Sequence, residues 1–178
     1  MLLDLLKLLA FQIGSEVSIN ELATQLGADV KTIQRYLDLL EKAFVIIRLG
    51  GFRRNLRQEV VNKSKYYFID NGIRNAVIAQ FNGLDQRNDV GALWENFMFV
   101  ERLKYRTYSS LYANMYFWRT YDRQEIDLVE EHGGKLYGYE FKWSENKTFP
   151  APKIWIGAYP EAAFKVINTG NYQDFIFD

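Results

Sequence analysis

The sequence contains no cysteine, only three prolines and one histidine among 178 residues. The absence of cysteine excludes disulfide bonds and thiolate metal sites, and it fits a cytoplasmic protein. No apolar run reaches the ~18 residues that a membrane span needs. The N-terminal segment Met-Leu-Leu-Asp-Leu-Leu-Lys lacks the basic start and the cleavage site of a signal peptide. We therefore expect a cytoplasmic chain without a membrane partner.

The net charge of zero conceals a basic block over residues 31–65. This block holds nine Lys and Arg residues against three acidic ones, and the rest of the chain is acidic by the same surplus. A local basic block is what phosphate binding requires. The alternatives are a solvated basic surface or a surface that faces an acidic partner domain.

Three helical segments followed by two strands are expected in the first 82 residues. Apolar spacing predicts helices over 2–11, 19–26 and 30–43, and the second follows the capping box Ser18-Ile19-Asn20-Glu21. Two short helices joined by a glycine-containing turn indicate a helix-turn-helix. Strand-prone runs over 44–49 and 65–69, with a turn at Gly50-Gly51, complete a winged helix.

Polar residues near the start of the third helix are candidate base contacts, because recognition helices meet bases there. Together with the arginines of the basic block, the candidate nucleic-acid-binding residues are Lys31, Thr32, Gln34, Arg35, Arg48, Arg53, Arg54 and Arg57. We expect duplex DNA as the partner. The alternative is a protein-docking module, because the fold by itself does not decide the function.

A second domain is predicted over 83–178, after a polar, glycine-containing boundary. Its pattern predicts a helix over 90–105, a strand over 114–120, two hairpin arms, a helix near 154–163 and a last strand over 164–168. The four tryptophans, Tyr137, Tyr139 and Phe141 are assigned to the core.

The two hairpin arms, 125–129 and 136–143, alternate charged and apolar residues around Gly133-Gly134. A Gly-Gly pair suits a two-residue turn because both positions need positive φ. That turn sets His132 opposite Lys135, Asp127 opposite Glu140 and Glu125 opposite Lys142. Like charges directly opposite each other are destabilising, so the Asp127–Glu140 pair favours a cation or a proton between the two carboxylates.

Asp127 followed by Glu140-Phe141-Lys142 resembles the D…(D/E)-x-K signature of the restriction-endonuclease-like, or PD-(D/E)xK, superfamily. Glu95 resembles the acidic residue that many members carry on the helix before the sheet. Nearly the whole chain also resembles the C-terminal portion of a prokaryotic AAA+-type ATPase family, in which a winged helix precedes a DUF4143-type domain. The resemblance implies an α+β or α/β protein, with a winged helix-turn-helix followed by a restriction-endonuclease-like mixed-sheet domain.

The chain departs from that family at one point, because it has no phosphate loop of the form G-x-x-x-x-G-K-[ST]. It is therefore either a fragment or a relative without the motor. The resemblance implies an ATPase domain, absent from this chain, as a partner.

The resemblance also implies roles for individual residues. Asp127, Glu140 and the backbone carbonyl of Phe141 would hold Mg²⁺ or Mn²⁺, which activates water for attack on a phosphodiester. Lys142 would position that water or stabilise the developing anion. The implied catalytic set is Glu95, Asp127, Glu140 and Lys142.

Simpler interpretations stand beside these roles. A Glu125–Lys142 ion pair, a solvated strand face, or a contact of Glu95 with Arg102 or a lysine would need no chemistry. Two functions are therefore expected as alternatives: a metal-dependent DNA nuclease with its own DNA reader, or a catalytically inactive nuclease-fold module that binds DNA or a partner.

Overall fold

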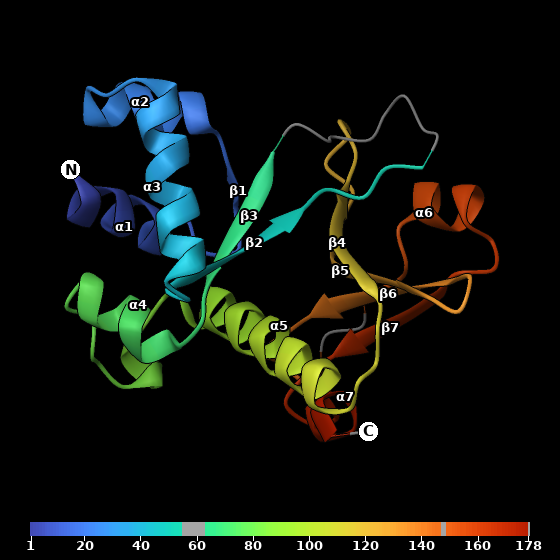
Figure 1. Ribbon diagram of the computed structural model, residues 1–178. Coiled ribbons are helices and arrows are strands. Elements are labelled where there is room, and N and C mark those ends of the chain that lie inside the picture. The colour runs from blue at the N-terminus through green and yellow to red at the C-terminus, as the bar shows by residue number, and fades with distance from the viewer. Residues whose placement is uncertain (55–62, 147–148, 178) are drawn as a thin grey trace. The chain divides into compact units, whose positions relative to one another are not determined.

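The computed structural model describes residues 1–54, 63–146 and 149–177 (Figure 1). The described residues form seven α-helices and two sheets, so the fold is mixed α+β. They gather into two compact units, of which the first comprises Met1–Leu49 and Lys63–Val100. The second comprises residues 50–54 and the chain from Glu101 onward. The domain division at residue 82 stays a prediction.

The first unit contains four helices, a 3₁₀ turn, the beginning of a fifth helix and a three-stranded sheet of order β1-β3-β2. In chain order its elements are α1 (Leu2–Phe11), β1 (Glu16–Val17), α2 (Ile19–Leu26), α3 (Val30–Lys42), β2 (Ile46–Gly50), β3 (Ser64–Phe68), α4 (Asn71–Val77), η1 (Leu84–Gln86) and α5 (Val90–Tyr108).

The predicted helix starts are confirmed by their caps. The Ser18 hydroxyl accepts a hydrogen bond from the Glu21 amide, and the Asp29 carboxylate accepts one from the Thr32 amide at 2.8 Å. Side-chain caps of this kind satisfy amides that have no partner inside the helix. The two caps fix where α2 and α3 begin, and thus which face α3 leaves exposed.

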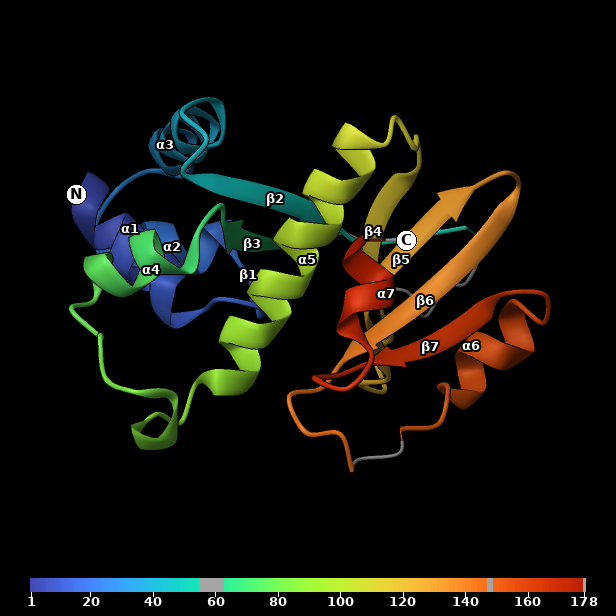
Figure 2. The ribbon, with the colours of Figure 1, turned by 90° about the horizontal axis from the view of Figure 1, so that it is seen from below.

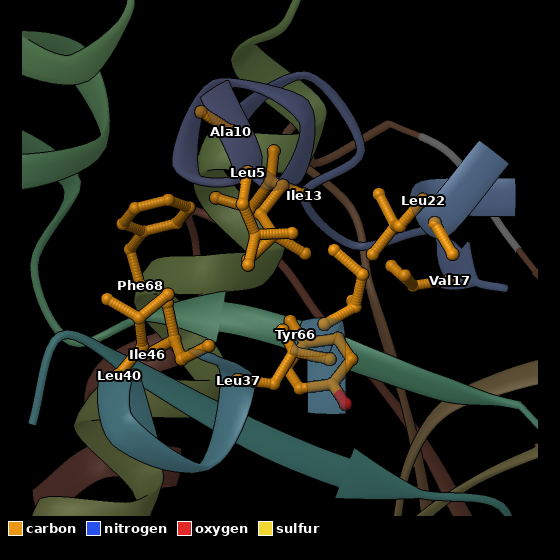
Figure 3. Packing of buried hydrophobic residues seen from close by; sticks show 13 residues of the cluster. Leu5, Ala10, Ile13, Val17, Leu22, Leu37, Leu40, Ile46, Tyr66 and Phe68 are labelled. Atoms are coloured by element: carbon orange, nitrogen blue, oxygen red, sulfur yellow. The ribbon is translucent and has the colours of Figure 1, made fainter. Parts of the chain in front are cut away.

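The core of the first unit is built from the apolar stripes of its helices and the inner face of its sheet. Figure 3 shows side chains of α1, α3 and β3 directed toward one another. The fully or almost fully buried members include Leu5, Leu9, Ile33, Leu37, Ile46 and Phe68. On α3 the apolar stripe of Ile33, Leu37 and Leu40 is buried, and Tyr36 beside it is half-buried.

The predicted turn at Gly50-Gly51 is wrong. Strand β2 begins at Ile46 and includes Gly50, and Gly51 forms a parallel bridge with Phe117 of the second unit. The strand continues because glycine carries no side chain that would oppose close pairing. The chain thus leaves the first unit at the point where a hairpin was expected.

The second unit is a four-stranded sheet of order β4-β5-β6-β7 with helices packed on it (Figure 2). The last strand is parallel to its neighbour, and the other pairs are antiparallel. After the end of α5 its elements are β4 (Asn114–Arg119), β5 (Glu125–His132), β6 (Lys135–Phe141), α6 (Lys153–Ala158), β7 (Ala163–Ile167) and α7 (Tyr172–Phe177). The predicted order helix–strand–strand–strand–helix–strand is confirmed.

The two short helices cover opposite faces of this sheet. Phe175 of α7 packs on Tyr139, whereas Trp155 of α6 packs on Trp118 and joins the cluster that contains Leu136. Residues 136 and 139 point to opposite faces of β6 because strand side chains alternate. Both faces of the sheet are therefore buried, and polar side chains on its central strands lie inside the unit.

Residues 50–54 form a strap on the second unit. The Phe52 amide donates a hydrogen bond to the Phe117 carbonyl at 2.6 Å, and the Phe52 ring packs against Trp155 and Tyr159. The Phe52 side chain is 3% exposed. A segment from the N-terminal half of the sequence thus completes the aromatic core of the second unit.

Three of the four tryptophans are buried as predicted, and the prediction for Trp143 is wrong because its side chain is 43% exposed. Tyr137 and Tyr139 are half-buried, and Phe141 is buried. Trp143 follows the end of β6, so the alternation that orients the strand residues does not extend to it.

Candidate functional site

The hairpin that carries the candidate residues has the predicted register. Gly133 and Gly134 have φ of 56° and 75°, the conformation that favours glycine in a tight turn. The ladder between β5 and β6 runs from His132 opposite Lys135 to Leu128 opposite Tyr139. Asp127 and Glu140 are the next residues of the two strands, immediately beyond the last pair of that ladder.

A bulge in β5 adjoins this position. Tyr116 pairs with Val129 and Trp118 pairs with Ile126, so three steps along β5 match two steps along β4. One extra residue in a strand bends it locally and redirects the side chains beside it. Asp127 lies within the bulged segment, so its direction follows from the bulge as well as from simple alternation.

Asp127 is held in place by the backbone of the neighbouring strand. Its side chain accepts a hydrogen bond at Oδ2 from the Phe141 amide at 2.8 Å. The residue is 5% exposed. A buried carboxylate is stable only with hydrogen bonds or an opposite charge, and the Phe141 amide supplies one such bond.

Glu140 is more deeply buried, with 1% exposure, and only part of its carboxylate is satisfied. Oε1 lies 2.6 Å from the Lys142 ammonium, whereas Oε2 has no hydrogen-bond partner among the described residues. Burial and the nearby charge of Asp127 raise the pKa of Glu140 to about 7, although the hydrogen bond from Lys142 acts in the opposite direction. The two carboxylates therefore influence each other inside the unit.

Lys142 is the third member of this group, which we call the carboxylate site (Asp127, Glu140 and Lys142). Its ammonium contacts Glu140 Oε1 and lies 4.6 Å from the centroid of the Phe149 ring. The side chain is 29% exposed, so this is where the site reaches solvent. An ammonium over an aromatic face is attracted by the ring quadrupole, which further orients the lysine.

The geometry bears on the simpler interpretations of this hairpin. A solvated strand face is excluded by the burial of Asp127 and Glu140. Glu125, expected to pair with Lys142, lies 4.0 Å from Arg119 on β4. The short ion pair of Lys142 is with Glu140 on its own strand.

The donor set fits a hard divalent cation. Mg²⁺ is commonly held by one or two carboxylates while it keeps several waters. The carboxylate site offers two carboxylates and a Glu140 oxygen with no other partner in the described chain. In residues 1–54, 63–146 and 149–177, no group of three or more His, Cys, Asp or Glu side chains could hold a metal ion. Any cation here would depend on water or substrate oxygens for its remaining ligands.

Glu95 is engaged within the first unit. Its Oε1 accepts hydrogen bonds from the Lys65 ammonium at 2.9 Å and from the Tyr67 hydroxyl at 2.7 Å. The carboxylate also lies against Gly14, where an added Cβ would be 2.8 Å from Glu95 Oε2. The expected lysine contact is thus present, through Lys65. Arg102, the other expected partner, pairs with Glu130.

The candidate nucleic-acid residues fall into both units. On α3, Lys31, Gln34 and Arg35 are exposed, and Thr32 is half-buried beside its cap. Arg48 also belongs to the first unit and donates to the Ser64 hydroxyl at 2.9 Å. The two strap arginines belong to the second unit, where one of them, Arg54, pairs with Glu131 at 2.6 Å. Arg57 lies outside the described residues.

Comparison with known proteins assigns the region that carries the carboxylate site. Residues 90–175 match DUF4143, a domain of unknown function. Residues 1–86 match a second domain of unknown function, DUF8612. The DUF4143 match contains Asp127, Glu140, Lys142 and Glu95, whereas the strap at 50–54 lies in the DUF8612 match. The resemblance to a DUF4143-type domain is confirmed.

Full-length relatives are much longer than this chain. Uncharacterized proteins of Mycobacterium tuberculosis and Mycobacterium bovis are each 33% identical over 138 residues, which cover 76% of this chain and 30% of the relative. An uncharacterized protein of Haemophilus influenzae is 30% identical over 105 residues, 59% of this chain and 23% of the relative. The chain thus spans less than a third of the length of these relatives.

No solved structure matches the chain. Within the described part of the sequence, no helix is long and apolar enough to cross a membrane.

Two residues beside the carboxylate site were not predicted as parts of it. Phe149 contacts Lys142, and Trp143, which the sequence assigns to the core, is exposed. An aromatic residue in a polar loop close to a candidate lysine is the signal that could have identified Phe149.

Proposed function

We propose that the carboxylate site hydrolyses phosphodiester bonds of DNA with the help of Mg²⁺ or Mn²⁺. The proposal rests on one observation: two buried carboxylates, Asp127 and Glu140, lie at the end of the same hairpin as a lysine whose ammonium is 2.6 Å from Glu140. Burying two acids together is costly unless a cation or a proton compensates them. A site that keeps two acids buried together, despite the free-energy cost, is a candidate functional site.

Each residue has a distinct part in this chemistry. The Glu140 oxygen Oε2 and the Asp127 carboxylate hold the cation, and the Phe141 amide keeps Asp127 oriented. The cation, when bound, supplies charge stabilisation and an activated water. Lys142 stabilises the negative charge that develops on the phosphate, because its ammonium reaches solvent beside Glu140.

The order of elements supports the nuclease-like assignment of the second unit. A helix, three antiparallel strands, a helix and a parallel fourth strand follow one another, and the acids lie on the second and third strands. This is the order that the resemblance to the PD-(D/E)xK superfamily implies. Fold alone does not give activity, so the chemistry of the site has to carry the assignment.

We further propose that the first unit is a winged helix that binds duplex DNA. Its element order α-β-α-α-β-β and its exposed polar residues on α3 support this assignment. Lys31, Gln34 and Arg35 lie in the first two turns of the helix, where recognition helices contact bases. The greater length of the relatives is consistent with an ATPase portion as a partner in the complete protein.

A catalytically inactive module is the second candidate, and one observation favours it. The ion pair between Lys142 and Glu140 occupies both groups at 2.6 Å, so it compensates half of the buried charge without a metal. In that case the site would stabilise the hairpin and the protein would only bind DNA.

Cleavage assays separate the two candidates. The intact chain is incubated with supercoiled and single-stranded DNA and Mg²⁺ or Mn²⁺, beside Glu140→Gln, Lys142→Ala and the matched control Glu161→Gln, an exposed acid of the same unit. We expect the wild type and the control to cleave, whereas the other two variants lose activity. Lys142→Ala should keep metal binding, because an ammonium is not a ligand. DNA binding without cleavage by the wild type would favour the inactive module.

A further inference from the structure

Two exposed aromatic side chains adjoin Lys142 in the second unit. Phe149 is 39% exposed, and its ring lies under the Lys142 ammonium at 4.6 Å. Trp143 is the chain neighbour of Lys142 and is 43% exposed. Large aromatic side chains normally contribute buried area to a core, as Trp94, Trp118 and Trp155 do here with at most 6% exposure. Trp143 is the exception among the four tryptophans, and it follows Lys142, where the carboxylate site meets solvent.

We propose that Trp143 and Phe149 stack on unpaired bases, so that the site takes single-stranded nucleic acid. This inference rests on the proposed function, because it names the substrate class of that same site. Every base has a flat face that stacks on an aromatic ring, whereas the bases of an intact duplex are already stacked on each other. A strand placed on the two rings has its phosphates beside Lys142, the cation of the site.

The charges around the site fit this ligand. Asp127 and Glu140 are buried, whereas the Lys142 ammonium beside the Phe149 ring is partly exposed. The exposed Glu145 accepts a hydrogen bond from the Thr169 hydroxyl. Proteins that bind single strands without sequence preference combine a positive charge for the backbone with aromatic rings for the bases. Trp143 follows Lys142 in the chain, and the Phe149 ring contacts the Lys142 ammonium, so the charge and the aromatic residues lie close together.

Tryptophan fluorescence gives a direct readout, because Trp143 is the exposed indole while the other three tryptophans are buried. The intact chain is titrated in EDTA, so that no cleavage occurs, with oligo(dT), with oligo(U) and with duplex DNA of the same length. We expect the single strands to quench the fluorescence and the duplex to leave it almost unchanged. Comparison of oligo(dT) with oligo(U) shows whether the site prefers DNA or RNA.

Variants assign the effect to the two rings. Stacking contributes about 1–3 kcal/mol per base, so Trp143→Ala and Phe149→Ala should each weaken oligo(dT) binding about 5- to 100-fold. Trp143→Phe should restore the affinity but not the quenching. Tyr112→Ala, at a residue that is 92% exposed elsewhere in the same unit, serves as the matched control and should bind like the wild type. All of these substitutions lie in the second unit, so any nucleic-acid binding by the first unit contributes equally to every measured affinity.

Three outcomes would overturn the inference: no quenching by single strands, equal quenching by duplex, or unchanged affinity in both alanine variants. Because binding is measured without metal, a protein that stacks single strands but never cleaves would contradict the proposed hydrolysis alone. A protein that cleaves duplex and single strands equally, with no loss in Trp143→Ala or Phe149→Ala, would contradict the stacking alone.

Discussion

Asp127 accepts a hydrogen bond from the backbone amide of Phe141 at 2.8 Å, immediately beyond Leu128 and Tyr139, the last pair of the β5–β6 ladder. The Asp127 side chain accepts a hydrogen bond from β6 at the point where the backbone ladder between β5 and β6 ends. This orients the Asp127 carboxylate, and burial and the charge of that carboxylate raise the pKa of Glu140. The bulge in β5 opposite Tyr116 and Trp118 makes the arrangement sterically accessible.

Metal binding at the carboxylate site predicts a stabilised protein. A ligand that binds only the folded state raises the free energy of unfolding by about 2.7 kcal/mol at one hundred times its Kd. We expect millimolar Mg²⁺ or Mn²⁺ to raise the Tm, and Asp127→Asn to abolish the rise while its amide oxygen still accepts from Phe141. Scanning calorimetry with and without metal tests this, with Glu161→Gln as the control. An unchanged wild-type Tm would contradict the site.

The raised pKa of Glu140 predicts a pH-dependent stability in metal-free buffer. The folded protein binds this proton more tightly than the unfolded chain, whose glutamate has a pKa of 4.5. The free energy of unfolding should therefore fall as pH rises from 4.5 to about 7, by about 3 kcal/mol at 1.36 kcal/mol per pKa unit. Glu140→Gln should lack this loss. Urea unfolding of both proteins in EDTA between pH 4.5 and 8 measures the difference, and parallel pH curves would contradict the prediction.

Local signals in the sequence predicted the helix caps, the hairpin register and the order of the second unit, because each depends on neighbouring residues. Ser18, Asp29 and Gly133-Gly134 act within a few positions along the chain. The bulge at Asp127 and the strap at Phe52 could not be predicted in this way, since both arise from contacts between segments far apart in sequence. The burial of Glu140 could not be predicted from the sequence for the same reason. Trp155 and Phe175 cover opposite faces of the sheet only after α6 and α7 have folded onto it.

Glu95 is predicted to stabilise the first unit, whatever else it does. Its partner Lys65 has a side chain that is 5% exposed, so removing the Glu95 charge breaks a buried ion pair. Breaking a buried pair in this way costs about 3–5 kcal/mol. In urea unfolding, Glu95→Gln should lower the free energy of unfolding by that amount, and the double variant Glu95→Gln with Lys65→Met should recover part of it. A Glu95→Gln variant as stable as the wild type would show that the pair contributes nothing.

Duplex DNA binding by α3 predicts a steep salt dependence. Each phosphate contact contributes about 0.9 to the slope of log K against log salt concentration. Lys31→Ala combined with Arg35→Ala should flatten the slope by about 2 if both residues contact phosphates. Lys153→Ala, at an exposed lysine of the second unit, is the control. Fluorescence anisotropy over a range of salt concentrations measures the slopes, and no binding even at low salt would favour the docking role of this unit.

Phe52 is predicted to be required for the stability of the second unit, although it lies outside the DUF4143 match. Its ring is 3% exposed and lies 6.1 Å from Trp155 and 5.6 Å from Tyr159, centroid to centroid. Replacing a buried phenylalanine by alanine costs about 3–5 kcal/mol, because it removes apolar contacts and leaves a cavity. We expect Phe52→Ala to lower the unfolding midpoint and to increase hydrogen exchange in β4 and α6 more than in α1 and α3.

The neighbouring Arg53 provides the matched control for this strap, because its side chain is exposed. Arg53→Ala should leave stability and exchange unchanged, since an exposed residue outside an ion-pair network contributes little. Equal protection of β4 and α6 in wild type and Phe52→Ala would mean that the second unit does not depend on the strap. Faster exchange confined to those elements would establish that a segment of the N-terminal half is a structural part of the domain that carries Asp127 and Glu140.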